Sequence, residues 1–491
     1  MLQKLFKSAA IYGLADVIAR FIAFAIFPIY AHFFTVEEFG VFALVSTAAA
    51  LVALIVNLGM STAMQRFYLD RDTTAADRPR IVTTGLVVLA AWAAVIVIVT
   101  ISAAVPFRDL LATRYHIELI LVLLALATNL PSQLLQYFQD VLRVRFLPWQ
   151  FTVVTTMKNV AGVALGLVLV IGFNYRLEGL FLGQLIAVSL AVPLGLWLVR
   201  AELTPAFDAG LARKLVAYGY PFLFGGFAYW VIGSLDVWML GELSDQTNVG
   251  WYGIASKVAV IVTFANGAFG QAWAPFALKT YAEDPDYARV LSRSFSHWFF
   301  VLGLLGSALS LFAFELLWIL TPASYWPATT TISALAAAMV MLGTTQITVL
   351  GLSLSRRTSA IARCAWITAG AHLLANILLI PRLGALGAGI ANITSYTLLT
   401  GLYLVYSQRL HPLALNWGQF VPILLMTALA ATAGILLGFM PWSPVLLAGK
   451  AGFICGMLML GHRLGILNPG AIAALLGLRK SSLGKHNESQ L

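Results

Sequence analysis

Residues 149–172 have the sequence WQFTVVTTMKNVAGVALGLVLVIG, which is long and apolar enough to cross a bilayer as one helix. This stretch carries one charged residue, Lys158, near its middle, and no acidic residue lies within a helical turn of it. A cationic side chain at that depth costs at least roughly 2.5–3.5 kcal/mol. Three arrangements would relieve this cost: the side chain could reach for the interface, pair with an acid from another helix, or face an anionic ligand in a water-filled cavity.

Stretches of the same kind recur along the whole chain and predict an all-α integral membrane protein. Apolar residues make up 60% of the chain and charged residues only 10%, which is far less polar than a soluble protein of this length. The first stretch is too long for the apolar part of a cleavable signal peptide, so we expect it to remain as a helix. We place about 14 transmembrane helices at residues 9–34, 41–65, 81–105, 117–138, 149–172, 178–199, 215–241, 249–274, 292–320, 328–352, 360–380, 385–407, 419–440 and 443–462.

The basic residues of the loops are distributed unequally between the two sides of the membrane. Loops on the side of the N-terminus carry Lys4, Lys7, Arg66, Arg71, Arg78, Arg80, Arg143, Arg145, Arg200, Arg213, Lys214, Lys279, Arg289, Arg293, Arg356, Arg357, Arg363 and Arg409, whereas the opposite loops carry only Arg108, Arg114, Arg176 and Arg382. By the positive-inside rule, we expect both termini in the cytoplasm. The basic residues behind the net charge of +10 are therefore distributed by membrane side and are not clustered on one soluble face, so we expect no nucleic acid partner.

A faint internal repeat predicts how the helices are grouped. Phe39-Gly40-Val41-Phe42 opens the second predicted span, and Val249-Gly250-Trp251-Tyr252 opens the eighth. An offset of six spans gives parallel repeats, and transporters built in this way place the substrate between the repeats. We therefore expect two parallel six-helix lobes around a central cavity, plus an extra C-terminal helix pair. The predicted division is an N-terminal lobe at residues 1–200, a C-terminal lobe at 213–409, a helix pair at 417–463 and a cytoplasmic tail at 464–491.

Two further cations accompany Lys158 inside predicted spans, and together they predict a cationic, substrate-binding cavity. Arg20 follows Asp16 by four residues, so the two could form an ion pair on one helix face, or Asp16 could tune an Arg20 that faces the cavity. Lys257 and Asp236 lie in the outer halves of neighbouring spans. They could form a structural ion pair, or a coupling pair in which Asp236 is protonated in one state and releases Lys257.

Other charged and uncharged residues in the spans have both structural and functional interpretations. Glu315 and Lys450 lie nearer helix ends, and we interpret both as interfacial. Pro28 in the first span could make a static kink or a bend that serves gating. The amides predicted to line the cavity or bind sugar hydroxyls are Gln133, Asn159 and Gln271, and Trp273 could stack on a sugar ring. The structural alternatives are hydrogen bonding between helices for the amides and packing for the tryptophan.

The sequence contains no pattern typical of an enzyme. Gly225-Gly226 and the glycines between Gly384 and Gly389 lack the Gly-Lys-Ser/Thr ending of a phosphate-binding loop, and no spacing indicates a metal site or a nucleophile with its base. The only two cysteines, Cys364 and Cys455, lie in apolar stretches and are interpreted as free thiols. We therefore expect neither cofactor nor metal, and transport driven by an ion gradient or the membrane potential.

Three parts of this chain resemble polysaccharide-biosynthesis flippases of the Wzx type, within the multidrug/oligosaccharidyl-lipid/polysaccharide exporter superfamily. The parts are Pro28-Ile29-Tyr30 through Glu37-Glu38-Phe39-Gly40-Val41-Phe42, then Asn57-Leu58-Gly59-Met60 to Gln65-Arg66-Phe67-Tyr68, and finally Ser234-Leu235-Asp236, Gly250-Trp251-Tyr252-Gly253-Ile254-Ala255-Ser256-Lys257-Val258 and Gln271-Ala272-Trp273-Ala274-Pro275-Phe276. The resemblance extends in general character over residues 1–410. Many members have Arg directly after the motif aspartate, where this chain has Val237.

The resemblance implies a V-shaped bundle of two lobes in the bacterial inner membrane. It implies alternating access that moves an undecaprenyl-pyrophosphate-linked oligosaccharide to the periplasmic leaflet, for O-antigen, capsule or exopolysaccharide synthesis. A polysaccharide polymerase and chain-length machinery would then be partners, beside membrane lipid. The cations inside the spans agree with this, because basic side chains in a low-dielectric cavity attract a pyrophosphate strongly.

Four alternative functions stay open. A peptidoglycan-precursor flippase would share the mechanism with a different head group. A cation-coupled multidrug exporter of the same superfamily would need acids in its cavity, where we predict bases. A membrane glycosyltransferase or polymerase would usually carry a sizeable segment outside the membrane, whereas the predicted loops here are short. A structural subunit of an export complex would not need basic residues at depth.

Overall fold

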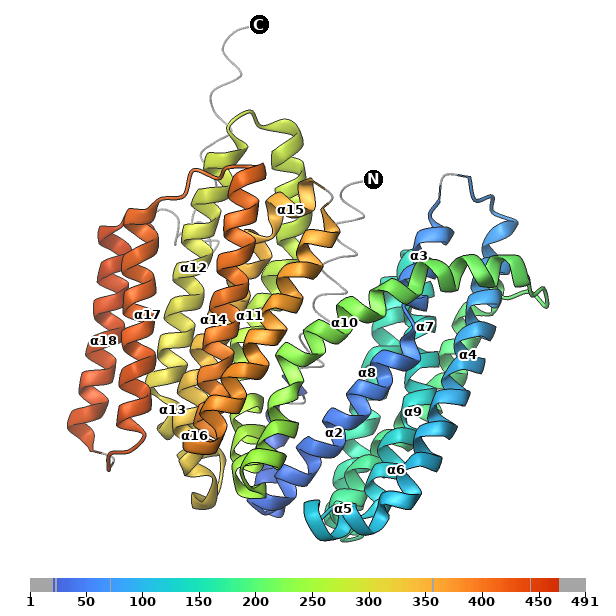
Figure 1. Cartoon of the computed structure of the whole chain (residues 1–491), viewed down its shortest axis with the longest axis horizontal. Helices are drawn as coiled ribbons and strands as arrows, with labels where there is room; N and C mark the ends of the chain where they lie inside the picture. Colours follow the sequence, from blue (N-terminus) through green and yellow to red (C-terminus); the bar gives the residue numbers. More distant parts are fainter. Residues whose placement is uncertain (1–20, 23, 71, 356, 442, 468–491) are drawn as a thin grey trace, which may run out of the picture.

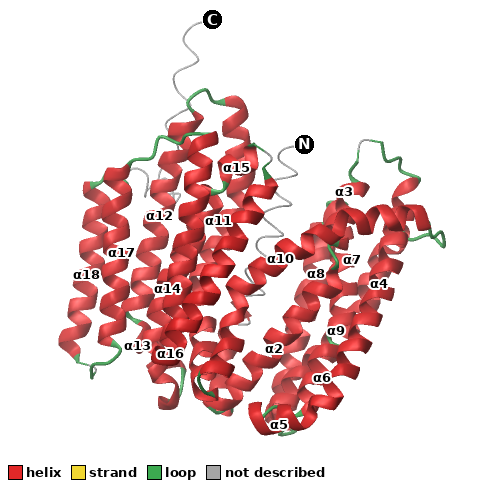
Figure 2. Ribbon diagram, in the orientation of Figure 1, coloured by secondary structure: helices red, strands yellow, loops and turns green. Residues whose placement is uncertain are grey.

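The computed structural model describes residues 21–22, 24–70, 72–355, 357–441 and 443–467. Within these ranges all regular secondary structure is helical, as Figure 2 shows. Twelve of the described helices are long and apolar enough to cross a membrane, and a shorter apolar helix covers Phe24–Phe33. The prediction of an all-α membrane protein is therefore confirmed.

The N-terminal lobe contains the helix Phe24–Phe33 and α2 to α9. Its helices are α2 (Val36–Asn57), α3 (Met60–Tyr68), α4 (Asp77–Ala104), α5 (Arg108–Tyr115), α6 (Leu119–Ala127), α7 (Asn129–Val144), α8 (Pro148–Leu167) and α9 (Arg176–Val199). Short 3₁₀ turns at Val105–Phe107 and Arg200–Glu202, and a π-helical turn at Val168–Gly172, extend α4, α9 and α8. Leu58 and Gly59, both with positive φ, separate α2 from α3.

The C-terminal lobe begins with a helix that crosses from one lobe to the other. The first half of α10 packs on α3, and its second half packs on α16 (Figure 1). The helices of this lobe are α10 (Ala209–Leu243), α11 (Gln246–Glu283), α12 (Tyr287–Leu311), α13 (Ala313–Leu320), α14 (Thr329–Thr348), α15 (Leu350–Leu354) and α16 (Thr358–Leu410), followed by the pair α17 (Trp417–Leu437) and α18 (Pro444–Arg463). The pair packs on α12 and α14, on the side away from the N-terminal lobe.

Helix α16 contains two of the predicted spans, joined at a sharp bend. Gly384 has φ 53° and ψ −130°, a conformation that glycine adopts at little cost. The amide of Ala385, which follows the bend, donates a hydrogen bond to Oδ1 of Asn248 at 2.9 Å. The side chain of another helix thus caps the second half of α16.

The two lobes meet at one end of the molecule, where α2 crosses α11 (Figure 1). A Cβ added to Gly250 would lie 1.9 Å from the Val36 carbonyl oxygen, and one added to Gly40 would lie 2.6 Å from the Gln246 carbonyl oxygen. The repeat relates Val36 to Gln246 and Gly40 to Gly250 by one offset in sequence (246 − 36 = 250 − 40 = 210), so each glycine meets the counterpart of the residue that the other one meets. The contact is therefore reciprocal, as expected for parallel repeats related by a pseudo-twofold axis.

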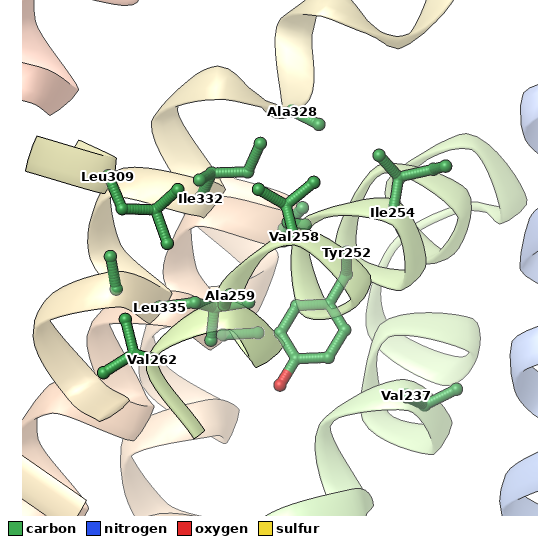
Figure 3. Packing of buried hydrophobic residues seen from close by; sticks show 14 of the residues in the cluster. Val237, Tyr252, Ile254, Val258, Ala259, Val262, Leu309, Ala328, Ile332 and Leu335 are labelled. Atoms are coloured by element: carbon green, nitrogen blue, oxygen red, sulfur yellow. The ribbon is translucent and has the colours of Figure 1, made fainter. Parts of the chain in front are cut away.

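The core of the C-terminal lobe is formed by small and branched side chains on α11, α12 and α14. Figure 3 shows Val258, Ala259 and Val262 of α11 among Leu309 and Ile332, all of them buried. Inside a membrane such packing is driven by close van der Waals contact, because lipid tails are as apolar as these side chains. The tight packing makes α11 a rigid support for the residues that it presents to its other faces.

Candidate functional site

A cavity of about 320 Å³ lies in the N-terminal lobe, and one residue of the C-terminal lobe, Lys257, reaches it. Its walls come from the helix Phe24–Phe33, α2, α7, α8 and α9 of the N-terminal lobe, and α11 of the C-terminal lobe contributes Lys257. The polar residues that line it are Tyr30, Thr128, Ser132, Lys158, Asn159, Gln184 and Lys257. Two of the cations predicted from sequence, 99 positions apart (257 − 158), thus line one space.

Close packing of α8 on α9 positions the polar groups of the N-terminal lobe. A Cβ added to Gly183 would lie 2.6 Å from the backbone nitrogen of Gly166, so the close approach of the two helices requires a residue without a side chain at position 183. Gln184 follows Gly183 directly and lines the cavity beside Lys158 and Asn159 of α8. A half-buried lysine and two amides therefore share one wall.

Lys257 reaches the same cavity from the opposite lobe. Its side chain is exposed, and its ammonium lies 5.6 Å from the centroid of the Phe42 ring, in cation–π range. In the described part of the chain, neither Lys257 nor Lys158 forms an ion pair, and no acidic residue lines the cavity. Two positive charges that converge without a counter-charge make a site that attracts anions.

Aromatic side chains close the cavity at the end where the lobes meet. Phe34, Phe39 and Phe42 line it there, and Phe39 packs edge-on against Tyr325 of the C-terminal lobe with ring centroids 5.7 Å apart. The Tyr325 hydroxyl donates a hydrogen bond to the Phe34 carbonyl at 2.7 Å. The aromatic layer thus joins both lobes.

Polar contacts between the lobes surround this aromatic layer. Arg114 in the N-terminal lobe pairs with Glu242 at 2.5 Å, and the hydroxyl of Tyr115 also contacts Glu242. Thr247 donates a hydrogen bond to Glu37 at 3.1 Å. Exposed pairs of this kind each contribute little to stability.

Asp236 is fully buried in a polar cluster within the C-terminal lobe. The sequence suggested an ion pair with Lys257, but the structure places other groups around the carboxylate. Tyr252 donates to it at 2.5 Å, and its remaining contacts are Asn376 at 2.7 Å, Asn392 at 2.7 Å and Nε2 of His372 at 2.8 Å. The helices that supply these groups are α10, α11 and both halves of α16.

The hydrogen bonds around His372 define its protonation together with that of Asp236. The Ser395 hydroxyl donates to the Ala391 carbonyl at 2.7 Å, so its oxygen accepts from Nδ1–H of His372 at 2.8 Å. Nε2 then faces Asp236, and the contact needs one proton between the two atoms. The pair therefore holds one exchangeable proton in a dry environment, where adding or removing a charge is costly.

Several residues predicted from sequence have structural contacts instead of cavity positions. Gln133 accepts a hydrogen bond from Asn57 at 3.1 Å and donates to the Ala53 carbonyl, which joins α7 to α2. Trp273 is buried, stacks on Phe269 and donates to the Gln346 carbonyl at 3.1 Å. The observed contacts match the structural alternatives given above, which were hydrogen bonding between helices for Gln133 and packing for Trp273.

Of the predicted residues not yet placed, Pro28 is described by the structure. Pro28 belongs to the helix Phe24–Phe33, and its carbonyl contacts Nδ1 of His32 at 2.7 Å. Asp16, Arg20 and the side chain of Gln271 lie outside the described residues.

Sequence reasoning did not single out Gln184 or His372 as site residues. Each lies well inside a predicted span, as Lys158 does, so a systematic search for polar groups at depth would have found both.

The family model described as "Polysaccharide biosynthesis protein" matches residues 5–280. The chain belongs to this family. Sequence comparison with curated proteins found no match.

Solved structures of two kinds of membrane transporter share the fold. A structure titled "Lipid II flippase MurJ, inward closed conformation" is 13% identical, with a TM-score of 0.72 and coverage of 92% of this chain and 98% of that one. An inward-facing multidrug resistance MATE family transporter of the MOP superfamily is 14% identical, with a TM-score of 0.62 and coverage of 82% and 94%. An outward-facing MATE transporter has a TM-score of 0.57 at 13% identity, with coverage of 84% and 97%.

The fold of this chain is the one that these flippase and transporter structures share. Its many apolar helices make it a multi-pass membrane protein. The resemblance inferred from the three sequence stretches is therefore confirmed at the level of family and superfamily fold.

Proposed function

We propose that this protein is a flippase that moves an undecaprenyl-pyrophosphate-linked oligosaccharide across the bacterial inner membrane by alternating access. The observation that carries the proposal is the convergence of Lys158 and Lys257 on one cavity that no described acid lines. A pyrophosphate supplies the negative charge that these ammonium groups lack. Asn159 and Gln184 would bind sugar hydroxyls beside it.

The size and place of the cavity support the same substrate class. About 320 Å³ accommodates a pyrophosphate with an adjoining sugar, while further sugars extend between the diverging lobes. The lipid tail can stay in the bilayer, so only the polar head group needs the protected route.

The distribution of charge supports an inward-facing orientation for this conformation. The lobes diverge toward the end at which α3 finishes and α12 begins, and they meet at the opposite end (Figure 1). Arg66 and Arg143 belong to the last turns of α3 and α7, and Arg289 lies near the start of α12. With the basic end in the cytoplasm, as the positive-inside rule directs, the cavity accepts substrate from the cytoplasmic leaflet. Both termini are then cytoplasmic.

Energy would come from an ion gradient or the membrane potential, and the Asp236–His372 pair is the candidate coupling group. Its carboxylate, on α10, is bonded by groups from α11 and α16, so a change in its charge alters contacts among three helices at once. Protonation of Asp236 in one state would thus bias the lobe between two arrangements.

The charge of the cavity argues against a multidrug exporter for cationic compounds. Such a substrate would meet Lys158 and Lys257, and like charges in a low-dielectric site repel.

Flipping of a fluorescent polyprenyl-pyrophosphate oligosaccharide in proteoliposomes tests the proposal. We expect the wild type to flip this lipid, and Lys158→Ala and Lys257→Ala each to slow it at least about tenfold, because each removes a charge-assisted contact worth about 1.5–3 kcal/mol. Lys279→Ala is the matched control, since Lys279 also lies on α11 but outside the cavity.

Three outcomes of this experiment separate the alternatives. Unchanged rates in both cavity variants would contradict the cationic site. Flipping of a peptidoglycan-precursor lipid alone would favour that substrate class. An imposed pH gradient that accelerates the wild type and Asp236→Asn equally would remove Asp236 from coupling.

A further inference from the structure

A second cavity of about 440 Å³ lies at the basic end of the C-terminal lobe. The residues that line it are Arg289, Ser292, Arg293, Ser296, His297, Ala414, Asn416, Gln419, Gly465 and Ile466. None of these residues lines the central cavity, and no acid occurs among them. This second cavity is therefore a separate, positively charged site.

One face of α12 supplies the charges. Arg289, Arg293 and His297 follow one another at intervals of four residues, so they lie along the same side of the helix. Val301 continues this line one turn further and is 48% exposed. The face thus changes from cationic at the helix end to apolar toward the middle of the span.

The cationic groups are available to a ligand. Arg289 pairs with Asp286 at 2.9 Å, but both side chains are largely exposed, so the pair is weak. Arg293 has no ion-pair partner within the ranges that the structure describes. His297 donates Nδ1–H to the Arg293 carbonyl at 2.7 Å, so its Nε2 can donate to an anion in the imidazolium form.

The opposite wall joins the lobe to the extra helix pair. Ser292 donates to the Ala414 carbonyl at 2.6 Å, and Gln419 at the start of α17 donates to the Leu464 carbonyl at 2.8 Å. The ends of α12, α17 and α18 therefore converge on the cavity, and a bound ligand would contact all three.

We infer that this cavity binds the phosphate of an anionic phospholipid head group. Arginine N–H groups and the Ser296 hydroxyl are donors of the kind that a phosphate ester requires, and His297 adds a further one in its imidazolium form. The acyl chains would lie along Val301 of α12 and the exposed side chains Val421 and Leu425 of α17. A basic cluster at a helix end, followed by apolar residues, matches a lipid whose charge lies at the interface and whose tails lie deeper.

Native mass spectrometry of the full-length protein tests the inference, with phosphatidylglycerol as the anionic probe and phosphatidylcholine as the zwitterionic one. We expect the wild type to retain phosphatidylglycerol preferentially. The double variant Arg293→Gln/His297→Gln should lose this preference, with about a tenfold weaker apparent affinity. Arg213→Gln is the matched control, because Arg213 is exposed at the basic end of α10 and lies outside the cavity.

Further arms identify the source of the phosphate and exclude misfolding. Inorganic phosphate at millimolar concentration should not displace the lipid; displacement would overturn the lipid assignment in favour of a free anion. Arg293→Lys should retain part of the preference, because it keeps the charge. Equal phosphatidylglycerol retention by the wild type and the double variant would overturn the site, and so would an equal loss in Arg213→Gln.

Discussion

Lys450 on α18 forms a buried ion pair with Glu315 on α13. Its ammonium lies 2.7 and 2.9 Å from the two carboxylate oxygens, and the side chains are 6% and 17% exposed. Lys450 also lies 5.9 Å from the centroid of the Phe312 ring. From the sequence we interpreted both residues as interfacial; the structure shows in addition that they pair, and the pair links α18 to α13 of the C-terminal lobe.

Removing one partner of this pair should destabilise the protein strongly. Lys450→Met leaves Glu315 buried without its counter-charge, so we expect the free energy of unfolding to fall by about 3 kcal/mol. The double variant Lys450→Met/Glu315→Gln should recover part of this loss. Denaturant titration in detergent, followed by tryptophan fluorescence, measures the difference.

The exposed pair Lys279–Glu283 is the control for Lys450. Its atoms are 3.7 Å apart and the side chains are 57% and 66% exposed, so Lys279→Met should cost less than about 1 kcal/mol. Equal losses in the two lysine variants would contradict a buried, structural pair.

At the scale of elements, the bend in α16 determines how the buried cluster is assembled. His372 and Asn376 lie before Gly384, whereas Asn392 and Ser395 lie after it. Only the reversal of direction at Gly384 brings both halves of the helix around Asp236. The bend is therefore a requirement of the candidate coupling site and not merely a connection between two spans.

Gly384→Ala should distort this bend. The positive φ strains any residue with a Cβ, and that Cβ would lie 2.2 Å from Oδ1 of Asn248, the group that caps Ala385. We expect a loss of about 1–3 kcal/mol in stability, measured by thermal unfolding in detergent. Gly370→Ala, on the same helix with open space around its Cβ, should change stability little. Comparable losses in both variants would count against a special role for the bend.

At the scale of the whole molecule, the closed end depends on how closely α2 approaches α11. The reciprocal contacts of Gly40 and Gly250 allow the two backbones to touch, and the Glu37–Thr247 hydrogen bond then forms across the lobes. Lobes that rock about this crossing would expose the central cavity to alternate sides of the membrane. The crossing is thus the place where the conformational equilibrium can be shifted.

Gly250→Ala should open the closed end. Its Cβ would overlap the Val36 carbonyl, which forces the lobes apart. We expect disulfide cross-linking between Glu37→Cys and Thr247→Cys, introduced after replacement of Cys364 and Cys455, to fall at least about tenfold, as a shift of 1.4 kcal/mol would give.

Gly267→Ala on the same helix is the control, because nothing lies within 4 Å of its Cβ, and it should cross-link like the parent. Efficient cross-linking in Gly250→Ala would show that the closed end does not need this glycine.

The described spans could be predicted closely, because a helix in a membrane needs only a run of apolar residues of sufficient length. Lys158 and Lys257 could be proposed as cavity residues for a related reason, since the cost of a charge at depth is a property of the single residue. The repeat related Gly40 to Gly250 in the sequence, but only the structure shows that the two positions lie in contact.

The partners of each residue depended on the tertiary structure. Asp236 was predicted to pair with Lys257, but α11 directs Lys257 to the central cavity, while Asp236 is held by His372 on α16. Gln133 and Trp273 are bonded between helices, although their residue types suit a sugar site equally well. The sequence by itself determined which residues lie at membrane depth, because depth follows from position along one helix. Which of them meet depends on the rotation and packing of separate helices, and no local pattern encodes this.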